Sequence, residues 1–502
     1  MNTCSQCGRP FSDPACGPTH ALVYFEKSKL GRMPVILWVG DSPTVPTGFA
    51  ACTRAVCDHL HLQGWQVHVL GINEFGDPHP DVPYPIYPCW HPYEGGRDLL
   101  GATRLPYLIE SIKPDVVVIL SDPWQIPGYL DHINYHFKAN AYTSHRWTSS
   151  KTNSLNDPDE WARYCADCGV EGLSLDCGGD LPLDFPHCRQ NTPIVAWLAV
   201  DGLNQVTAPR LNDLTRVVVW TEFAANELVK RGLNRVVSGE NGECILSPCA
   251  VPLGVDTSIF RPATQSRARE ILFANLNLPI DPPPFIVGYV GRNQPRKRLD
   301  LLLAYFAEWI ATRNLTDAYL FLHVAPTKDM GADLQALAHY YGLDAVTGNG
   351  RLIVSEQPTH KGTDVFDMPL VYSAMDVFLA TTQGEGHGLC EHEAMACGTI
   401  VIAPDWSGLG SDGGWPTPGS IIHVPCTATA LTAPINSQCH TIGGIPDRIA
   451  TLQALDQVYN DWKVGEGPTA LVKLTGLKCA REFTWERSAR EMEKVLREVF
   501  EK

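Results

Sequence analysis

The feature that most constrains this sequence is an alternation of short, unbroken apolar runs with stretches of helical periodicity. Runs such as Pro34–Gly40, Pro114–Asp122 and Pro284–Gly291 lack the polar alternation of a half-exposed strand, which indicates strands buried on both faces of a parallel sheet. Helical spacing of apolar residues follows the first run from Ala50 onward. Strands and helices in alternation predict doubly wound α/β units with right-handed crossovers.

The alternation occurs in two series, which predicts two Rossmann-like domains facing a central cleft. We expect a cysteine-containing leader at 1–32, an N-terminal domain at 33–255, a second domain at 256–480 and a C-terminal helix at 481–502. Within the first domain the rhythm fails over 123–192, which we interpret as a cysteine-rich insertion.

Charge and hydropathy limit the partners of the chain. Its 502 residues contain 39 Lys and Arg against 55 Asp and Glu, a formal charge of −16 that repels nucleic-acid backbones and anionic membranes unless a local basic patch meets them. The sequence contains neither a signal-peptide h-region at 1–32 nor 18 consecutive apolar residues. We therefore predict a cytoplasmic protein with no membrane segment.

A glycine-rich loop occupies the position where two facing α/β domains bind ligands, at the carboxyl end of a strand. Thr381–Leu389 follows the predicted strand Met375–Ala380, and its glycines would let backbone amides approach an anion or a sugar closely. These glycines are Gly384, Gly386 and Gly388. A dinucleotide-binding fingerprint would need a further glycine at position 389, and Leu389 therefore disfavours a Rossmann dehydrogenase.

Charged residues flank this loop. Glu385 lies in the loop and Glu393 about one turn into a predicted helix over Glu391–Cys397, so both could face one site. Arg292 and Lys297 follow the strand Pro284–Gly291 and could neutralise a diphosphate. The alternatives are a solvated basic turn for the two cations, and a helix cap and a solvated helix residue for the two carboxylates.

Together these motifs resemble the retaining nucleotide-sugar glycosyltransferases of the GT-B fold, in the large glycosyltransferase family 4 (glycosyl transferases group 1). The resemblance rests on Gly291-Arg292 with Lys297 and Asp300, followed by Glu385, seven residues, Glu393 and Ala-Met-Ala-Cys-Gly. It extends in order of elements over roughly 34–502.

The resemblance implies a role for each matching residue. Arg292 and Lys297 would bind the donor diphosphate, which the loop of Gly48 would approach from the other domain, and Glu393 would bind the ribose hydroxyls. The residues implied beside the transferred sugar are Glu385, Gly386, His387, Gly388 and Leu389. Asp201 ends the strand on which the family often has a histidine, so Asp201 and Glu385 are the candidate catalytic residues. Packing within the loop is the alternative for His387, and an Asp-Gly turn is the alternative for Asp201.

The function implied is retaining transfer of a hexosyl or pentosyl group from a nucleotide-diphosphate sugar to a hydroxyl, without a metal at the donor. One alternative is a non-catalytic sugar-nucleotide or nucleic-acid binding protein of the same fold. Another is a sugar-nucleotide epimerase, which would need a base pair in the cleft that the sequence does not reveal.

Two groups among the 17 cysteines have the spacing of zinc ligands. The first comprises Cys165, Cys168, Cys177 and Cys188, and predicts a closed structural zinc site. The second comprises Cys4, Cys7, Cys16 and His20, a weaker zinc knuckle. Reduced thiols in a surface insertion are the alternative for the first group. Such modules raise a narrower hypothesis, in which the acceptor is a modified base or sugar in nucleic acid and the cysteine modules dock it.

Overall fold

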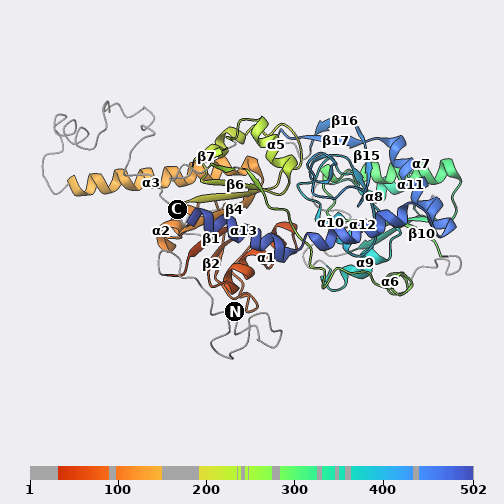
Figure 1. The fold of residues 1–502 in the computed structure, drawn as a ribbon, viewed down its shortest axis with the longest axis horizontal. Coiled ribbons are helices and arrows are strands. Elements are labelled where there is room, and N and C mark those ends of the chain that lie inside the picture. Colours follow the sequence, from red (N-terminus) through yellow and green to blue (C-terminus); the bar gives the residue numbers. More distant parts are fainter. Residues whose placement is uncertain are drawn as a thin grey trace.

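Two α/β domains lie side by side in the computed structural model (Figure 1). The structure describes residues 32–89, 98–149, 192–234, 236–238, 244–246, 248–273, 283–324, 331–344, 350–356, 363–432 and 440–500. No helix in these ranges is both long enough and apolar enough to cross a membrane.

The N-terminal domain is built on a seven-stranded parallel sheet in the order β3-β2-β1-β4-β5-β6-β9. Its strands are β1 (Val35–Asp41), β2 (Gln66–Ile72), β3 (Ile86–Pro88), β4 (Val116–Ser121), β5 (Ile194–Leu198), β6 (Arg216–Val219) and β9 (Cys249–Ala250). Its helices are α1 (Gly48–Leu62), α2 (Leu105–Ile112), α3 (Ile126–Ser149) and α5 (Glu222–Lys230), with 3-10 turns at Pro123–Gln125 and Ala208–Asp213. A separate hairpin joins β7 (Val236–Ser238) to β8 (Cys244–Leu246). The buried strands β4, β5 and β6 confirm the predicted parallel sheet.

The second domain has a six-stranded parallel sheet in the order β12-β11-β10-β13-β14-β15. Its strands are β10 (Phe285–Val290), β11 (Ala318–Val324), β12 (Leu352–Glu356), β13 (Val377–Leu379), β14 (Ile400–Pro404) and β15 (Ile422–Val424). β16 (Cys426–Leu431) and β17 (Ile442–Pro446) form a separate two-stranded antiparallel sheet. The helices are α6 (Gln265–Leu272), α7 (Leu299–Arg313), α8 (Leu334–Tyr340), α9 (Met368–Ser373), α10 (Leu389–Ala396), α11 (Arg448–Val464) and α12 (Thr469–Glu482), with 3-10 turns η4 (Pro295–Lys297) and η5 (Ser407–Leu409).

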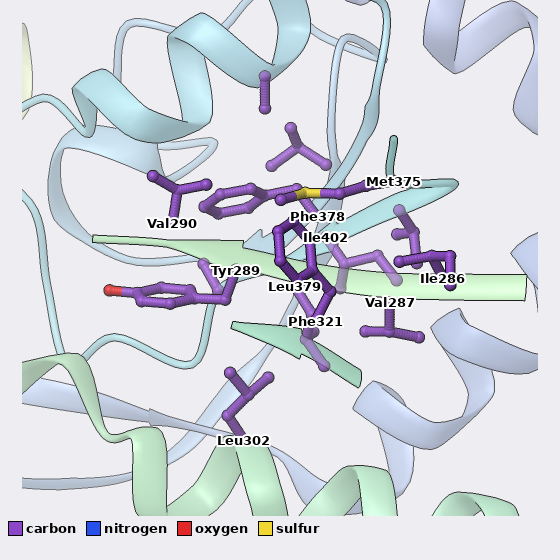
Figure 2. Packing of buried hydrophobic residues seen from close by; sticks show 14 of the residues in the cluster. Ile286, Val287, Tyr289, Val290, Leu302, Phe321, Met375, Phe378, Leu379 and Ile402 are labelled. Carbon is purple, nitrogen blue, oxygen red and sulfur yellow. The ribbon is translucent and has the colours of Figure 1, made fainter. Parts of the chain in front are cut away.

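The core of the second domain lies on both faces of β10, as expected for a strand of continuous apolar sequence. Figure 2 shows Tyr289 on the side of the strand that faces Leu302 of α7, with Met375 and Phe378 on the other side. Gly288 is required in this strand, because a Cβ there would lie 2.2 Å from the sulfur of Met375. This packing fixes the end of β10, from which the site residues follow.

The last helix, α13 (Trp485–Phe500), returns to the N-terminal domain and packs against α1, so its blue ribbon lies among the red and orange elements in Figure 1. The chain crosses between the domains twice at one place. Val255 pairs with Thr484, and Gly254 approaches the backbone of Thr484 and Trp485 so closely that a Cβ would lie 2.1 Å from it. The two connections between the domains therefore lie side by side.

The interpretation of the irregular interval at 123–192 needs correction. The proposed insertion at 123–192 begins with a 3-10 turn and the 24-residue helix α3, the crossover from β4 to β5, which projects beyond the domain (Figure 1). An insertion in this interval therefore cannot begin before residue 150. The interval from Asp405 to Asp447 is rich in Gly, Pro, Ser and Thr, yet it contains the sheet strand β15 and the hairpin of β16 and β17.

Candidate active site

The candidate site lies where the carboxyl ends of the two sheets meet. From the N-terminal domain, Asp41 ends β1, while Asp122 and Asp201 follow β4 and β5. From the second domain, Arg292 and Lys297 follow β10, and the glycine-rich loop follows β13. In a parallel sheet the loops that follow the strands all begin at this edge, so their residues lie close together there.

The glycine-rich loop touches the opposite domain through its backbone. A Cβ on Gly384 would lie 1.8 Å from the carbonyl oxygen of Asp201, and a Cβ on Gly386 would lie 2.8 Å from the ring of Trp220. These glycines are therefore needed so that the two domains can meet, a steric reason that is separate from any approach of amides to a ligand.

Gly388 turns the loop into α10. Its φ of 87° is a left-handed conformation that favours glycine, and it forms the N-cap of this helix. On the opposite side, Thr47 caps α1 by accepting a hydrogen bond from the backbone of Ala50 at 3.1 Å. A Cβ on Gly48 would lie 3.1 Å from Leu389. The positive ends of two helices, one from each domain, thus lie next to each other.

Glu385 is a buried carboxylate held by two cations. One of its oxygens lies 3.1 Å from the guanidinium of Arg296, and the ammonium of Lys297 donates a hydrogen bond to the other. Its backbone N–H donates to Ser407 at 3.0 Å. Burial opposes ionisation of Glu385, but the charges of Arg296 and then Lys297 prevail and lower its pKa. Glu385 is therefore an anion at neutral pH.

The N-terminal domain contributes three carboxylates. Burial raises the pKa of Asp122 to about 7, with a further increase from Asp201 and a partly opposing effect of Arg296. Desolvation also raises the pKa of Asp201, against the charge of Arg296. Asp41 accepts a hydrogen bond from Thr47 at 2.5 Å, but burial nevertheless raises its pKa. This edge of the domain is therefore acidic, and Asp122 titrates near neutral pH.

Arg292 is exposed, and its charge acts on Asp41 of the other domain, where it opposes the rise in the pKa of that carboxylate. It follows Gly291, whose φ of 154° is another left-handed position. A permanent cation thus lies between the end of β10 and the loop before α1.

Glu393 lies in the second turn of α10 and has a different neighbour. The hydroxyl of Tyr372, in α9, donates a 2.6 Å hydrogen bond to it. Burial raises the pKa of Glu393 to about 7, this hydrogen bond lowers it, and the nearby Glu391 raises it. Glu391 is itself buried, one of its oxygens has no hydrogen-bond partner, and burial together with Glu385 raises its pKa.

The side chain of His387 is buried beneath the loop. It stacks on Trp415 with ring centroids 4.5 Å apart, and one ring nitrogen lies 3.1 Å from a nitrogen of His392. Burial holds the pKa of His387 well below its usual range, so the ring is neutral. The placement agrees with packing, and any contact of this residue with a donor would be made by its backbone.

The zinc predictions fall outside the described residues: Cys165, Cys168, Cys177 and Cys188 lie in 150–191, and Cys4, Cys7, Cys16 and His20 in 1–31. In the ranges that are described, no group of three or more His, Cys, Asp or Glu side chains could hold a metal ion. Cys52, Cys57 and Cys397 are free and buried, as expected for small apolar residues.

The structure thus brings Glu385, Lys297 and Asp201 together, and places Gly48 against Leu389. It adds Arg296, Asp41 and Asp122, which our reading of the sequence did not select. Asp41 and Asp122 had a signal, since each ends a buried strand, as Asp201 does.

Sequence comparison identifies relatives of part of the chain. Residues 284–435 match the family model described as "Glycosyl transferases group 1". D-inositol 3-phosphate glycosyltransferase from Mycolicibacterium gilvum is 27% identical over 297 residues, which is 58% of this chain and 55% of that protein. The enzyme of the same name from Saccharomonospora viridis is 29% identical over 302 residues, 58% of each chain. This chain therefore spans little more than half the length of these curated relatives.

Solved structures resemble the whole arrangement. Sucrose-phosphate synthase from Thermosynechococcus elongatus superposes with a TM-score of 0.58 at 18% identity, covering 93% of this chain and 99% of that one. Anabaena HepE, in complex with UDP and glucose, gives a TM-score of 0.54 at 13% identity, covering 92% and 99%. These likenesses confirm the predicted fold of two facing Rossmann-like domains, the GT-B fold.

Proposed function

We propose that this chain, whose second domain matches the group 1 glycosyltransferases and whose fold is GT-B, is a retaining glycosyltransferase. It transfers a sugar from a nucleotide-diphosphate sugar to a hydroxyl acceptor. The observation that carries the proposal is the ionised Glu385, held by Arg296 and Lys297 at the meeting edge of the two sheets. An anion fixed there by its own cations suits a reaction that develops positive charge on a sugar.

The donor would lie mainly on the second domain. Arg292, Lys297 and the adjacent N-termini of α1 and α10 supply positive charge for a diphosphate. Glu393 is partly exposed and carries a carboxylate suited to accept hydrogen bonds from ribose hydroxyls. UDP is bound by Anabaena HepE, which shares the fold, and this supports a nucleotide donor for the present chain.

The chemistry follows from this placement. The bond between the anomeric carbon and the diphosphate oxygen breaks, and its electron pair remains on that oxygen, where Arg292 and Lys297 neutralise the charge. The acceptor oxygen bonds to the same carbon from the same face, and its proton passes to the diphosphate oxygen. Glu385 stabilises the positive sugar carbon between these events. Asp201 lies next to the loop that holds Glu385 and would orient the acceptor or the sugar.

We further propose that no metal acts at the donor. The cations that would neutralise the diphosphate are side chains: Arg292 and Lys297, with Arg296 holding Glu385. A divalent ion would duplicate their charge. Addition of a chelator such as EDTA is therefore expected to leave turnover unchanged, and a loss that magnesium restores would contradict this part of the proposal.

The acceptor side is formed by the acidic edge of the N-terminal domain, with Asp41, Asp122 and Asp201. A hydroxyl on nucleic acid, such as a modified base or sugar, remains one acceptor hypothesis, and the formal charge of −16 disfavours it. Binding to DNA or RNA at low salt would support the hypothesis, and its absence would end it.

A panel of UDP-, ADP- and GDP-sugars tests the proposal. We expect slow release of nucleotide from one donor by the wild-type protein, and loss of that release in Glu393→Gln. Glu482→Gln, on the exposed end of α12, is the control and should behave as wild type. If no donor is hydrolysed and no nucleotide raises the melting temperature, a non-catalytic binding protein becomes the better interpretation.

A further inference from the structure

Arg296 lies where the glycine-rich loop, Glu385 and the acidic edge of the opposite domain come together. We propose that Arg296 is a positioning residue that couples closure of the two domains to the orientation of Glu385. The inference rests on the proposed function, since Glu385 is assigned there to the transferred sugar.

Within its own domain, Arg296 is joined to the loop through both its side chain and its backbone. The guanidinium donates a 2.8 Å hydrogen bond to the carbonyl of Gly384 and lies 3.1 Å from the carboxylate of Glu385. The carbonyl of Arg296 accepts a hydrogen bond from the backbone N–H of Gln383 at 2.8 Å. Three consecutive loop residues are therefore fixed relative to this arginine.

Toward the other domain, the same guanidinium lies 3.9 Å from the carboxylate of Asp201. Gly384, to which Arg296 is bonded, is the residue that touches the carbonyl oxygen of Asp201. The charge of Asp122 also acts on Arg296. If the domains separated, Arg296 would remain with Glu385 and leave Asp201 and Asp122 without this cation.

The geometry also separates Arg296 from its neighbour Lys297. Both cations hold Glu385 when no donor is present, but Lys297 is the one assigned to the diphosphate. An arginine has five donors in a fixed fork, so Arg296 can keep Glu385, Gly384 and Asp201 at once while Lys297 turns to the donor. Arg296 would then be the cation that holds Glu385 during transfer.

Kinetics of three variants test this role. In Arg296→Gln we expect kcat for donor hydrolysis to fall about 100-fold, because Glu385 loses a charge partner. The KM for the donor should change less than about 3-fold, because Arg296 is not among the residues assigned to the donor. Arg296→Lys keeps the positive charge, so its kcat should be at least about tenfold higher than that of Arg296→Gln. Arg298→Gln is the matched control, because Arg298 belongs to the same basic run but pairs with Asp300 at 2.8 Å.

The pH dependence of kcat gives a readout that a loss of folding would not produce. Arg296 is the largest charge that lowers the pKa of Glu385, so its removal should move the acid limb of the profile to higher pH by at least one unit. The other charged or titratable groups around Glu385 and its arginine are Lys297, Asp201, Asp122, Glu391, Tyr289 and Cys390. None of them is changed in Arg296→Gln, whereas Arg296→Lys should keep the limb near its wild-type position.

Hydrogen exchange tests the coupling without any turnover. Peptides covering 199–203 and 381–389 should exchange faster in Arg296→Gln and in Asp201→Asn, and the double variant should exchange no faster than Arg296→Gln alone. Exchange that is unchanged in Arg296→Gln, or a drop in donor affinity as large as the drop in kcat, would overturn the proposal. If the wild-type protein hydrolyses no donor, the proposed function fails, while the exchange result still decides whether Arg296 joins the domains.

Discussion

Substituting Gly384 by alanine would test whether the two domains must touch for the reaction. Gly384 does not have a left-handed φ, so an added methyl group brings a steric cost and no backbone strain. The new Cβ would lie 1.8 Å from the carbonyl oxygen of Asp201, whereas Cβ atoms essentially never approach other atoms closer than 3.0 Å. The two backbones must therefore move apart by at least about 1.2 Å.

The magnitude follows from this displacement. A misplacement of about 1 Å in reacting groups costs about 100-fold in rate, which corresponds to about 2.7 kcal/mol in the activation free energy. The clash joins residues of different domains, so the core of neither domain is disturbed. We expect kcat/KM to fall about 100-fold while the melting temperature stays within about 2 °C of wild type.

Steady-state kinetics and small-angle X-ray scattering together provide the assay. The kinetics should show the loss in kcat/KM, and the scattering should show a larger radius of gyration for Gly384→Ala. Gly128→Ala is the control, because Gly128 lies in α3 with no atom within 4 Å of its added Cβ. That variant should keep wild-type kinetics and gain about 0.5–1 kcal/mol in stability.

Wild-type kcat/KM in Gly384→Ala, together with an unchanged radius of gyration, would refute the reasoning. The contact between Gly384 and Asp201 would then be dispensable, and the glycine would have to be explained by the approach of a ligand to the loop.

Two further predictions concern Glu393, and a third concerns the cysteines of the interval 150–191. Tyr372→Phe removes a hydrogen bond that lowers the pKa of Glu393, so this carboxyl should be more protonated at pH 7. Titration calorimetry should therefore show weaker nucleotide affinity at pH 7 and recovery by pH 9. Equal weakening at both pH values would contradict this prediction. The pKa of Glu393 is raised in the folded protein to about 7, above its unfolded value near 4.5, so wild-type stability should fall as pH rises through that window. Chemical denaturation should show that Glu393→Gln escapes this loss and is about 1–2 kcal/mol more stable than wild type at pH 8 but not at pH 4. Identical pH dependence of the two proteins would contradict the raised pKa of Glu393. Elemental analysis of protein purified without chelators should find zinc, and the zinc content should be lower in Cys165→Ser and Cys168→Ser. A zinc content near zero in the wild type would contradict the zinc site and leave that segment as a thiol-rich stretch.

Strands such as β1, β4 and β10 were predictable because each lies in a nearly unbroken apolar run between polar breaks. The run Pro284–Gly291 contains β10, and the run Pro114–Asp122 contains β4. The start of α3 was also predictable, because Ile126, Tyr129 and Leu130 have helical spacing, and all three are buried in the structure. The cysteines further along the chain led us to assign the whole interval 123–192 to one insertion. Strand β15 has only three residues, too few for any periodicity.

The candidate site was predictable as far as residue types at strand ends could take it. The 3-10 turn η4 and the left-handed φ of 52° at Arg298 decide which of Arg296, Lys297 and Arg298 faces the other domain. A run of three basic residues predicts neither feature. The inward orientation of the His387 ring depends on its tertiary contacts. Its ring lies against Trp415, which is 28 positions away in the sequence, so nothing local indicates that the ring points inward.

The return of α13 to the N-terminal domain has a consequence for synthesis of the protein. Met492 and Leu496 are fully buried in the core shared with Cys52 and Val56 of α1. A ribosome must therefore pass residue 500 before the first domain to emerge can complete its hydrophobic core, although the second domain needs nothing beyond α12. A chain truncated after α12 would have a complete second domain and an incomplete first domain. Premature termination there should thus expose the first domain to chaperones and proteases.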